Sequence, residues 1–237
     1  MILPPAMLHL PIDTILPQLL DAFQNNPNLV LSAAPGAGKT TRIPPALLQI
    51  IPPEAGRIIM LEPRRIAAAS AARYMAGLLG EAVGQTVGYT IRFESKLSRN
   101  TRIELVTEGV LTRRIQNDPE LTGVACVIFD EFHERSLHAD LGLALCLETQ
   151  AALRPDLKLL VMSATLECEP IARMLGDAPI VVSEGRQFPV ELRYLPDAGR
   201  LPLPKRMARA IQQALAAEHG DLLAFLPGTG EIRAVER

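Results

Sequence analysis

Residues 29–41 read Leu-Val-Leu-Ser-Ala-Ala-Pro-Gly-Ala-Gly-Lys-Thr-Thr, and this stretch decides the fold. An apolar run typical of a buried strand leads into a loop of small residues, which is followed by Lys-Thr and a helical pattern. A phosphate-binding loop has the pattern G-x-x-x-x-G-K-[ST], which gathers backbone N–H groups and a lysine around phosphate oxygens. Gly38, Lys39 and Thr40 match this pattern, whereas Ala33 stands where its first glycine is expected. The stretch therefore predicts a nucleotide-phosphate site, and a flexible Ala/Gly turn before a helix is the alternative.

A second apolar run, residues 124–129, ends in Asp130-Glu131-Phe132-His133-Glu134-Arg135. Adjacent carboxylates repel each other, so a fold tolerates them more easily when a cation or a proton lies between them. At the C-terminal end of a parallel strand they face the crevice in which α/β proteins bind ligands. The alternative is a charged helix start, where acidic residues are common. Beside a phosphate loop, these residues predict that Thr40, Asp130 and Glu131 serve a bound Mg²⁺ and that Glu131 polarises the attacking water.

Composition limits the classes of function. The chain has 237 residues, of which 48% are hydrophobic, and a net charge of −2, so it is long enough for one full core and part of a second. Only 4% of the residues are aromatic and tryptophan is absent, which argues against an aromatic stacking platform for nucleic-acid bases. The near-neutral charge carries no global signature of nucleic-acid binding, so a local stripe would have to hold such a partner.

Three cysteines, Cys126, Cys146 and Cys168, lie far apart in the sequence without metal-ligand spacing. We expect buried free thiols in a reducing, cytoplasmic compartment. The apolar N-terminus has no basic start and several prolines, so we expect neither a signal peptide nor a membrane span.

Apolar runs without alternation are separated by helical patterns, which indicates a mostly parallel sheet covered by helices on both faces. Strands are expected at residues 29–33, 57–61, 86–92, 102–106, 124–130, 157–163 and 179–183. Helices are expected at residues 12–24, 39–50, 66–79, 109–117, 137–153 and 169–175. The fold class is thus α/β, with a first domain over residues 1–183.

The pattern changes after residue 183. A connector leads to an expected strand at 190–195, a helix at 205–218, a strand at 222–226 and a helical start at 230–237. We interpret residues 184–237 as a connector and the truncated start of a second α/β domain, because one strand and half a helix cannot bury their own apolar surface.

Six spaced motifs give the chain its resemblance to the DEAH/RHA branch of superfamily 2 helicases, over nearly the whole chain. They are residues 35–41 (motif I), 61–68 (Ia), 107–111 (Ib), 130–135 (II), 163–165 (III) and 223–228 (IV). Phe132, where most relatives have alanine, is similar to the bacterial HrpB type. The resemblance implies two RecA-like domains, ATP and Mg²⁺ as cofactors, and single-stranded nucleic acid, RNA in the first place, as partner.

The resemblance also implies roles for individual residues. The implied ATP-binding residues are Pro35, Gly36, Ala37, Gly38, Lys39, Thr40, Thr41 and Arg73, and the catalytic ones are Lys39 and Glu131. The implied nucleic-acid contacts are Arg64, Arg65, Arg92 and Thr107, and the coupling residues are His133, Ser163 and Thr165. Arg73 would stack on adenine, although a solvated helix charge is its alternative, and Thr107 could simply cap a helix. Ser163-Ala164-Thr165, whose hydroxyls would meet His133, could be a small-residue turn.

The leading hypothesis is therefore an ATP-driven helicase that couples hydrolysis to movement along RNA. A nucleotide-gated binding or scaffold protein is the alternative, although the intact Glu131 argues against it. An unrelated P-loop kinase or transporter ATPase would leave the paired Arg64-Arg65 without a role. We expect the arginine fingers of the family to lie beyond residue 237, so residues 1–237 alone should bind nucleotide at most weakly and should not unwind.

Overall fold

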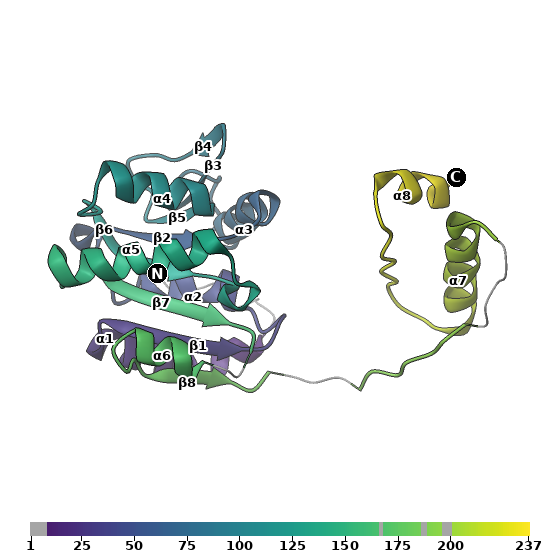
Figure 1. The fold of residues 1–237 in the computed structure, drawn as a ribbon, viewed down its shortest axis with the longest axis horizontal. Helices are drawn as coiled ribbons and strands as arrows, with labels where there is room; N and C mark the ends of the chain where they lie inside the picture. Colours follow the sequence, from purple (N-terminus) through teal and green to yellow (C-terminus); the bar gives the residue numbers. More distant parts are fainter. Residues whose placement is uncertain (1–8, 166–167, 186–188, 196–200) are drawn as a thin grey trace. The chain divides into compact units, whose positions relative to one another are not determined.

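The computed structural model describes residues 9–165, 168–185, 189–195 and 201–237 (Figure 1). The chain divides into two compact units, of which one ends at Gln187 and the other begins at Phe188. The first unit contains one sheet and the helices that cover it. The assignment of the second unit to a further RecA-like domain stays a prediction.

The sheet of the first unit has eight strands in the order β4-β3-β5-β2-β6-β7-β1-β8. Their bounds are β1 Asn28–Ala33, β2 Arg57–Leu61, β3 Val87–Ile91, β4 Glu94–Lys96, β5 Ile103–Val106, β6 Val124–Phe129, β7 Lys158–Ser163 and β8 Ile180–Ser183. All neighbouring strands run parallel except β3 and β4. The mostly parallel α/β fold is thus confirmed, and each strand expected before residue 184 is present to within one residue at either end. The edge strand β4 was not expected, because its three exposed residues have no apolar signal.

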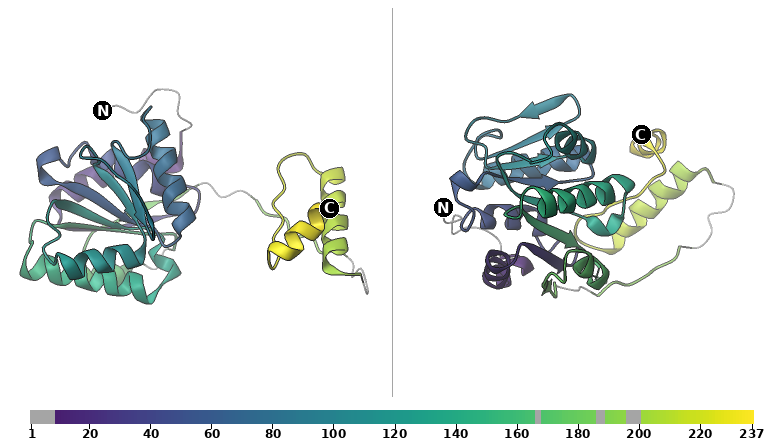
Figure 2. Two further views of the ribbon diagram at one scale, coloured as in Figure 1. Left: turned by 90° about the horizontal axis from the view of Figure 1, so that it is seen from above. Right: turned by 60° about the vertical axis from the view of Figure 1, so that its left-hand side comes forward.

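Helices cover both faces of this sheet, as the two views of Figure 2 show. They are α1 Leu16–Asn25, α2 Lys39–Leu47, α3 Arg65–Leu78, α4 Glu108–Asn117, α5 Leu137–Ala152 and α6 Glu169–Met174. Buried side chains of α1, α2 and α3 pack in one core cluster, and those of α4, α5 and α6 pack in a second. In β1, Leu29 and Leu31 belong to the first cluster and Val30 to the second. A strand whose two faces are both buried has to be apolar at every position, which is why these strands read as unbroken apolar runs.

The described residues also contain three short 3₁₀ helices, at Pro11–Thr14, Pro53–Ala55 and Phe132–Glu134. The helix expected at residues 12–24 therefore forms in two parts, a 3₁₀ turn and then α1. Pro17 lies in the first turn of α1, where a missing backbone N–H costs no hydrogen bond.

The second unit contains α7 Leu203–Ala217 and α8 Thr229–Glu236, close to the expected helices. The strands expected at residues 190–195 and 222–226 are wrong, since both segments lie within the described residues and neither forms a strand. A strand exists only through hydrogen bonds to a neighbouring strand, and the described part of this unit offers helices and extended segments without such pairing. Among the described residues, no helix has the length and apolar character needed to cross a membrane.

The parallel arrangement brings the C-terminal ends of β1, β7, β6, β2, β5 and β3 to one edge of the sheet. The segments at the ends of β1, β2, β5, β6 and β7 each carry one of the sequence motifs, and the candidate Arg92 follows β3. The strand order therefore lines up the phosphate loop after β1, the acidic segment after β6 and the basic segments after β2 and β3 along the same edge.

Candidate functional site

The phosphate loop connects β1 to α2. Gly36 and Gly38 have φ angles of 76° and 96°, in the left-handed region that glycine adopts without steric cost. Ala33, which departs from the motif, is the last residue of β1 and pairs with Ser183 of β8. Strand conformation does not need glycine, so the loop tolerates alanine there. The first N–H groups of α2, which begins at Lys39, have no carbonyl partner one turn earlier and make this helix end a site for an anion.

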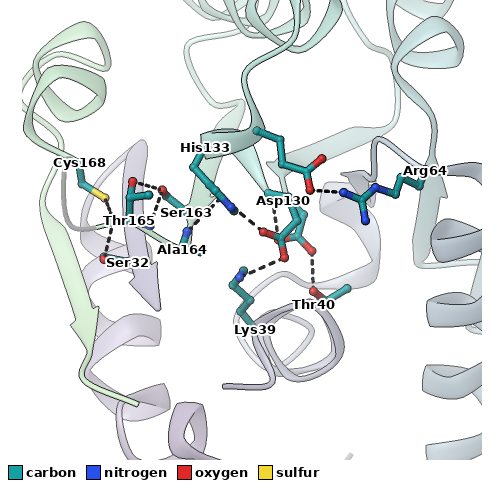
Figure 3. Close-up of polar contacts among 12 residues, drawn as sticks. Ser32, Lys39, Thr40, Arg64, Asp130, His133, Ser163, Ala164, Thr165 and Cys168 are labelled. Carbon is teal, nitrogen blue, oxygen red and sulfur yellow. Dashed lines mark hydrogen bonds and ion pairs between the residues drawn. The ribbon is translucent and has the colours of Figure 1, made fainter. Parts of the chain in front are cut away.

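Two contacts join α2 to the end of β6. The Nζ atom of Lys39 lies 3.1 Å from Oε1 of Glu131, and the Oγ1 atom of Thr40 donates to Oδ2 of Asp130 at 2.6 Å. Figure 3 shows Lys39 and Thr40 facing Asp130 from across the crevice. Because β7 separates β1 from β6 in the sheet, these side chains reach over the end of one intervening strand.

Glu131 has a backbone conformation that is rare outside glycine, with a φ angle of 49°. Its N–H donates to Oδ1 of Asp130 at 2.8 Å. Adjacent strand residues normally point to opposite faces, and the left-handed conformation ends this alternation, so that Asp130 and Glu131 both reach α2. Such strain costs on the order of 1–3 kcal/mol and occurs most often at functional sites.

The crevice carries more acid than base. Burial and the nearby charge of Glu131 together raise the pKa of Asp130 to about 6, against the hydrogen bond from Thr40, which lowers it. Glu62, the residue after β2, has a pKa of about 7, mainly because it is buried and next because of the charge of Asp130. Sequence reasoning gave Glu62 no role, although it follows β2 as Asp130 follows β6. The carboxylates of Glu62, Asp130 and Glu131 thus lie close enough to raise one another's energy, and the electrostatics favour an added cation.

The donor set at this point suits Mg²⁺. The described residues contain no group of three or more histidine, cysteine or acidic side chains that could hold a metal by itself. Mg²⁺ at nucleotide sites takes one or two protein oxygens and obtains the rest from phosphates and water. Thr40 and Asp130 bring together two such oxygens. The raised pKa of the buried Asp130 carboxylate indicates that its surroundings do not fully compensate its negative charge. Glu131, also predicted to serve the metal, is engaged with Lys39 in this structure.

A cavity of about 430 Å³ opens beside the phosphate loop. Its lining is formed by Leu10, Gly36, Gly38, Lys39, Thr40, Thr41, Tyr74 and Glu131. Arg73, predicted to stack on adenine, does not line it. The Arg73 guanidinium donates to the Tyr89 hydroxyl at 3.1 Å and lies 5.5 Å from the centre of that ring. The neighbouring Tyr74, 56% exposed on α3, lines the cavity instead, and sequence reasoning missed it because a single aromatic residue on a helix carries no pattern.

His133 joins the acidic segment to the end of β7. Its Nδ1 atom accepts a hydrogen bond from the backbone N–H of Ala164 at 3.2 Å and lies 3.4 Å from Oε2 of Glu131 (Figure 3). The hydroxyls of Ser163 and Thr165 contact each other at 3.1 Å. The structure therefore brings the three coupling candidates together, but histidine meets the segment through a backbone amide rather than through the hydroxyls.

The basic candidates lie farther along the same edge. Arg64 forms an ion pair with Glu134, the fifth residue of the acidic segment. Arg65 donates to the carbonyl oxygen of Arg92 at 2.9 Å. Thr107 occupies the N-cap position of α4, but its side chain makes no capping hydrogen bond. Arg92 and Thr107 both line a second cavity, of about 840 Å³, between the β3–β4 hairpin and α4.

Comparisons with known proteins place these features in context. The family model for the DEAD/DEAH box helicase matches residues 13–174. The ATP-dependent RNA helicase HrpB of Escherichia coli is 54% identical over 97% of this chain, which spans 28% of that protein. The ATP-dependent RNA helicase HrpA homolog of Haemophilus influenzae is 39% identical over 86% of this chain, which spans 16% of that protein. The crystal structure of the Escherichia coli DEAH/RHA helicase HrpB superposes with a TM-score of 0.88 and 53% identity, over 96% of this chain and 29% of that one.

Proposed function

This chain belongs to the DEAD/DEAH box helicase family, and from that premise we propose that the whole protein hydrolyses ATP to move along and unwind RNA. One observation carries the ATP part of the proposal. Lys39 and Thr40, at the start of α2, meet Asp130 and Glu131, at the end of β6, although ninety positions separate Thr40 from Asp130. A phosphate-binding helix end and an acidic strand end brought together in this way suit a nucleoside triphosphate.

The phosphate chain of ATP would lie along the loop of residues 35–41. There Lys39 and the N–H groups of the α2 helix end neutralise its charge. Thr40 and Asp130 would hold Mg²⁺, which would supply positive charge to offset the negative charge of the phosphates. Lys39 and Asp130 are buried and are held by contacts with Glu131 and Thr40, which supports a fixed geometry, the main requirement for phosphoryl transfer.

Glu131 is the residue that we assign to the attacking water. In this structure Lys39 neutralises it, and a phosphate group that took over Lys39 would leave the carboxylate free to accept a hydrogen bond from water. The same carboxylate lies beside His133, whose imidazole contacts the backbone of Ala164 after β7. His133 thus connects Glu131 to the segment of residues 163–165, so that a change in the contacts of Glu131 can move that segment.

We propose that RNA binds the arginines at the C-terminal edge of the parallel sheet. Arg64, Arg65 and Arg92 lie at strand ends with their side chains largely exposed, and phosphate contacts of this kind position a strand without reading its bases. Both of the relatives described above are named RNA helicases, which supports RNA over DNA. Three buried free cysteines, Cys126, Cys146 and Cys168, support our proposal of a reducing, cytoplasmic compartment.

The test is the release of phosphate from ATP by the whole protein, with and without single-stranded RNA. We expect RNA to stimulate the rate several-fold and Glu131→Gln to lower the stimulated rate by at least 100-fold, because water loses its base. Lys39→Ala serves as the variant that fails earlier, at nucleotide binding. A rate that responds neither to RNA nor to Glu131→Gln would favour a nucleotide-gated binding protein instead.

A further inference from the structure

A serine directly after the acidic segment joins two helices. Ser136 is the N-cap of α5, and its Oγ atom accepts a hydrogen bond from the backbone N–H of Ala139 at 2.9 Å. The same hydroxyl donates to Oε1 of Glu108, the first residue of α4. A hydroxyl has one hydrogen to donate as well as lone pairs to accept, so the cap does not need the bond to Glu108. The start of α5 therefore accounts for only one of the two bonds.

This second bond connects the acidic segment to the start of α4. Ser136 follows Arg135, the last residue of the acidic segment, whereas Glu108 follows Thr107, the candidate nucleic-acid contact at the N-cap of α4. In the sheet, β2 lies between β5 and β6, so the two segments reach each other across the end of one strand. Buried side chains of α4 and α5, which lie side by side in Figure 1, pack in the same core cluster. The first turns of the two helices are thus held together both by the core and by the Ser136–Glu108 bond.

The turn between Glu131 and Ser136 is stiff. Glu131 and Arg135 have φ angles of 49° and 45°, a left-handed conformation that residues other than glycine keep only where their surroundings determine it. Between them, the ring of Phe132 is buried in the second core cluster, and the N–H of Arg135 donates to the carbonyl oxygen of Phe132 at 3.2 Å. A change in the contact of Glu131 with Lys39 is therefore passed along the turn to Ser136 instead of being lost in a flexible loop.

We propose that the hydrogen bond from Ser136 to Glu108 couples the nucleotide site to the RNA-binding edge of the sheet. Ser136 and Glu108 are positioning residues, which act by fixing the start of α4 and with it Thr107. The proposal rests on the proposed binding of ATP and RNA and deepens it, because it names a route that bypasses His133 and residues 163–165. Hydrogen bonds to a carboxylate are among the stronger ones, and both partners are partly buried.

The coupling factor is the ratio of the RNA dissociation constants of the whole protein without and with a non-hydrolysable ATP analogue. In wild type the two constants should differ by about five-fold or more, and in Glu108→Ala by less than about two-fold. Glu108→Gln is the matched control, because it removes the same charge but keeps an oxygen that accepts from Ser136, so it should retain the wild-type factor. A general effect of charge on RNA affinity acts with and without nucleotide and cancels in the ratio. The rate of ATP hydrolysis in the absence of RNA should be the same in wild type and in both variants.

Substitutions of Ser136 separate the coupling from the helix cap. Aspartate and asparagine both cap helices about as well as serine, so both variants should keep the fold, which thermal melting checks. Ser136→Asp places a second carboxylate against Glu108 and should lose the coupling factor. Ser136→Asn keeps an N–H group that donates to Glu108 and should retain most of the factor.

The outcomes distinguish this coupling from the proposed function. If nucleotide changes the RNA affinity of wild type and Glu108→Ala leaves the factor unchanged, the hydrogen bond does not couple the sites and the proposed function stands. An equal loss in Glu108→Ala and Glu108→Gln also overturns the coupling, because the charge and not the hydrogen bond would then matter. A wild-type factor of one overturns it while RNA binding stands. If wild type binds no RNA, the proposed function fails as well.

Discussion

The Nζ atom of Lys39 lies 3.1 Å from Oε1 of Glu131, so the lysine of the phosphate loop and the acid proposed to activate water neutralise each other. Lys39 is 3% exposed, and a buried ammonium group needs such a partner when no phosphate is present. Nucleotide binding would therefore exchange one partner of Lys39 for another.

We expect Glu131→Gln to strengthen nucleotide binding while it abolishes turnover. Removal of the carboxylate leaves Lys39 free for phosphate. The dissociation constant of a fluorescent ATP analogue for the 237-residue chain should therefore fall by about two- to ten-fold, which is the range expected for the loss of one partly buried ion pair. Lys39→Ala should raise it by at least ten-fold. Weaker binding by Glu131→Gln than by wild type would show that Glu131 supports the nucleotide instead of competing with it.

Glu134 should compete with RNA for Arg64. The two side chains form an ion pair, and both are exposed, so the pair contributes only about 0–1 kcal/mol. We expect Glu134→Gln to tighten RNA binding by about two- to five-fold at low salt and Arg64→Ala to weaken it. The matched control is Asp140→Asn, which removes the same charge from the nearby pair of Arg135 and Asp140.

The salt dependence of RNA affinity separates a direct contact from a general change of charge. If Arg64 neutralises a phosphate, the slope of log K against log salt should become shallower by about 0.7 in Arg64→Ala. Equal effects of Glu134→Gln and Asp140→Asn would instead indicate that only the net charge matters.

Glu62 should make the stability of the protein depend on pH in the absence of nucleotide and Mg²⁺. Its pKa rises from an ordinary value of 4.5 to about 7 in the folded protein, mainly through burial. The folded state therefore binds this proton more tightly than the unfolded state, so the stabilisation is complete below about pH 4.5 and is lost as the pH rises through 7. Asp130, with a pKa raised to about 6, acts in the same direction.

Replacement of Glu62 by glutamine checks this sign. At pH 8, Glu62→Gln should be more stable than wild type by an amount on the order of 1–3 kcal/mol, because no buried charge has to form. At pH 5 the two proteins should unfold at similar urea concentrations. Glu148→Gln, on the exposed surface of α5, controls for the loss of one negative charge. A larger gain at pH 5 than at pH 8 would contradict the assignment.

Ala33→Gly would restore the standard first glycine of the phosphate loop, and we expect it to bring no gain. Ala33 lies in β1, is 1% exposed and pairs with Ser183, so its conformation does not call for glycine. Glycine in this strand should cost about 0.5–1 kcal/mol of stability, measured by urea unfolding, and change nucleotide affinity by less than two-fold. A ten-fold gain in affinity would mean that the loop geometry is limited by this alanine.

Local patterns in the sequence were enough to locate the main elements of the first unit. β6 illustrates the reason. A strand that is buried on both faces is apolar at every position, so the sequence of residues 124–129 predicts a strand even when the neighbouring strands are unknown. The phosphate loop could be predicted from Gly38, Lys39 and Thr40 in the same way, because such a loop is built from consecutive residues. The same local reasoning misplaced strands at 190–195 and 222–226, since apolar composition does not supply a pairing partner.

Only the tertiary structure decided which side chains meet. The strand order puts β7 between β1 and β6, and from it follow the pairing of Lys39 with Glu131 and the contact of His133 with Ala164. That Tyr74 rather than Arg73 borders the phosphate-loop cavity depends on the direction of two neighbouring side chains on α3. Periodicity and motif spacing are short-range properties that consecutive residues encode, whereas strand order and side-chain direction depend on the packing of distant segments, which no local pattern records.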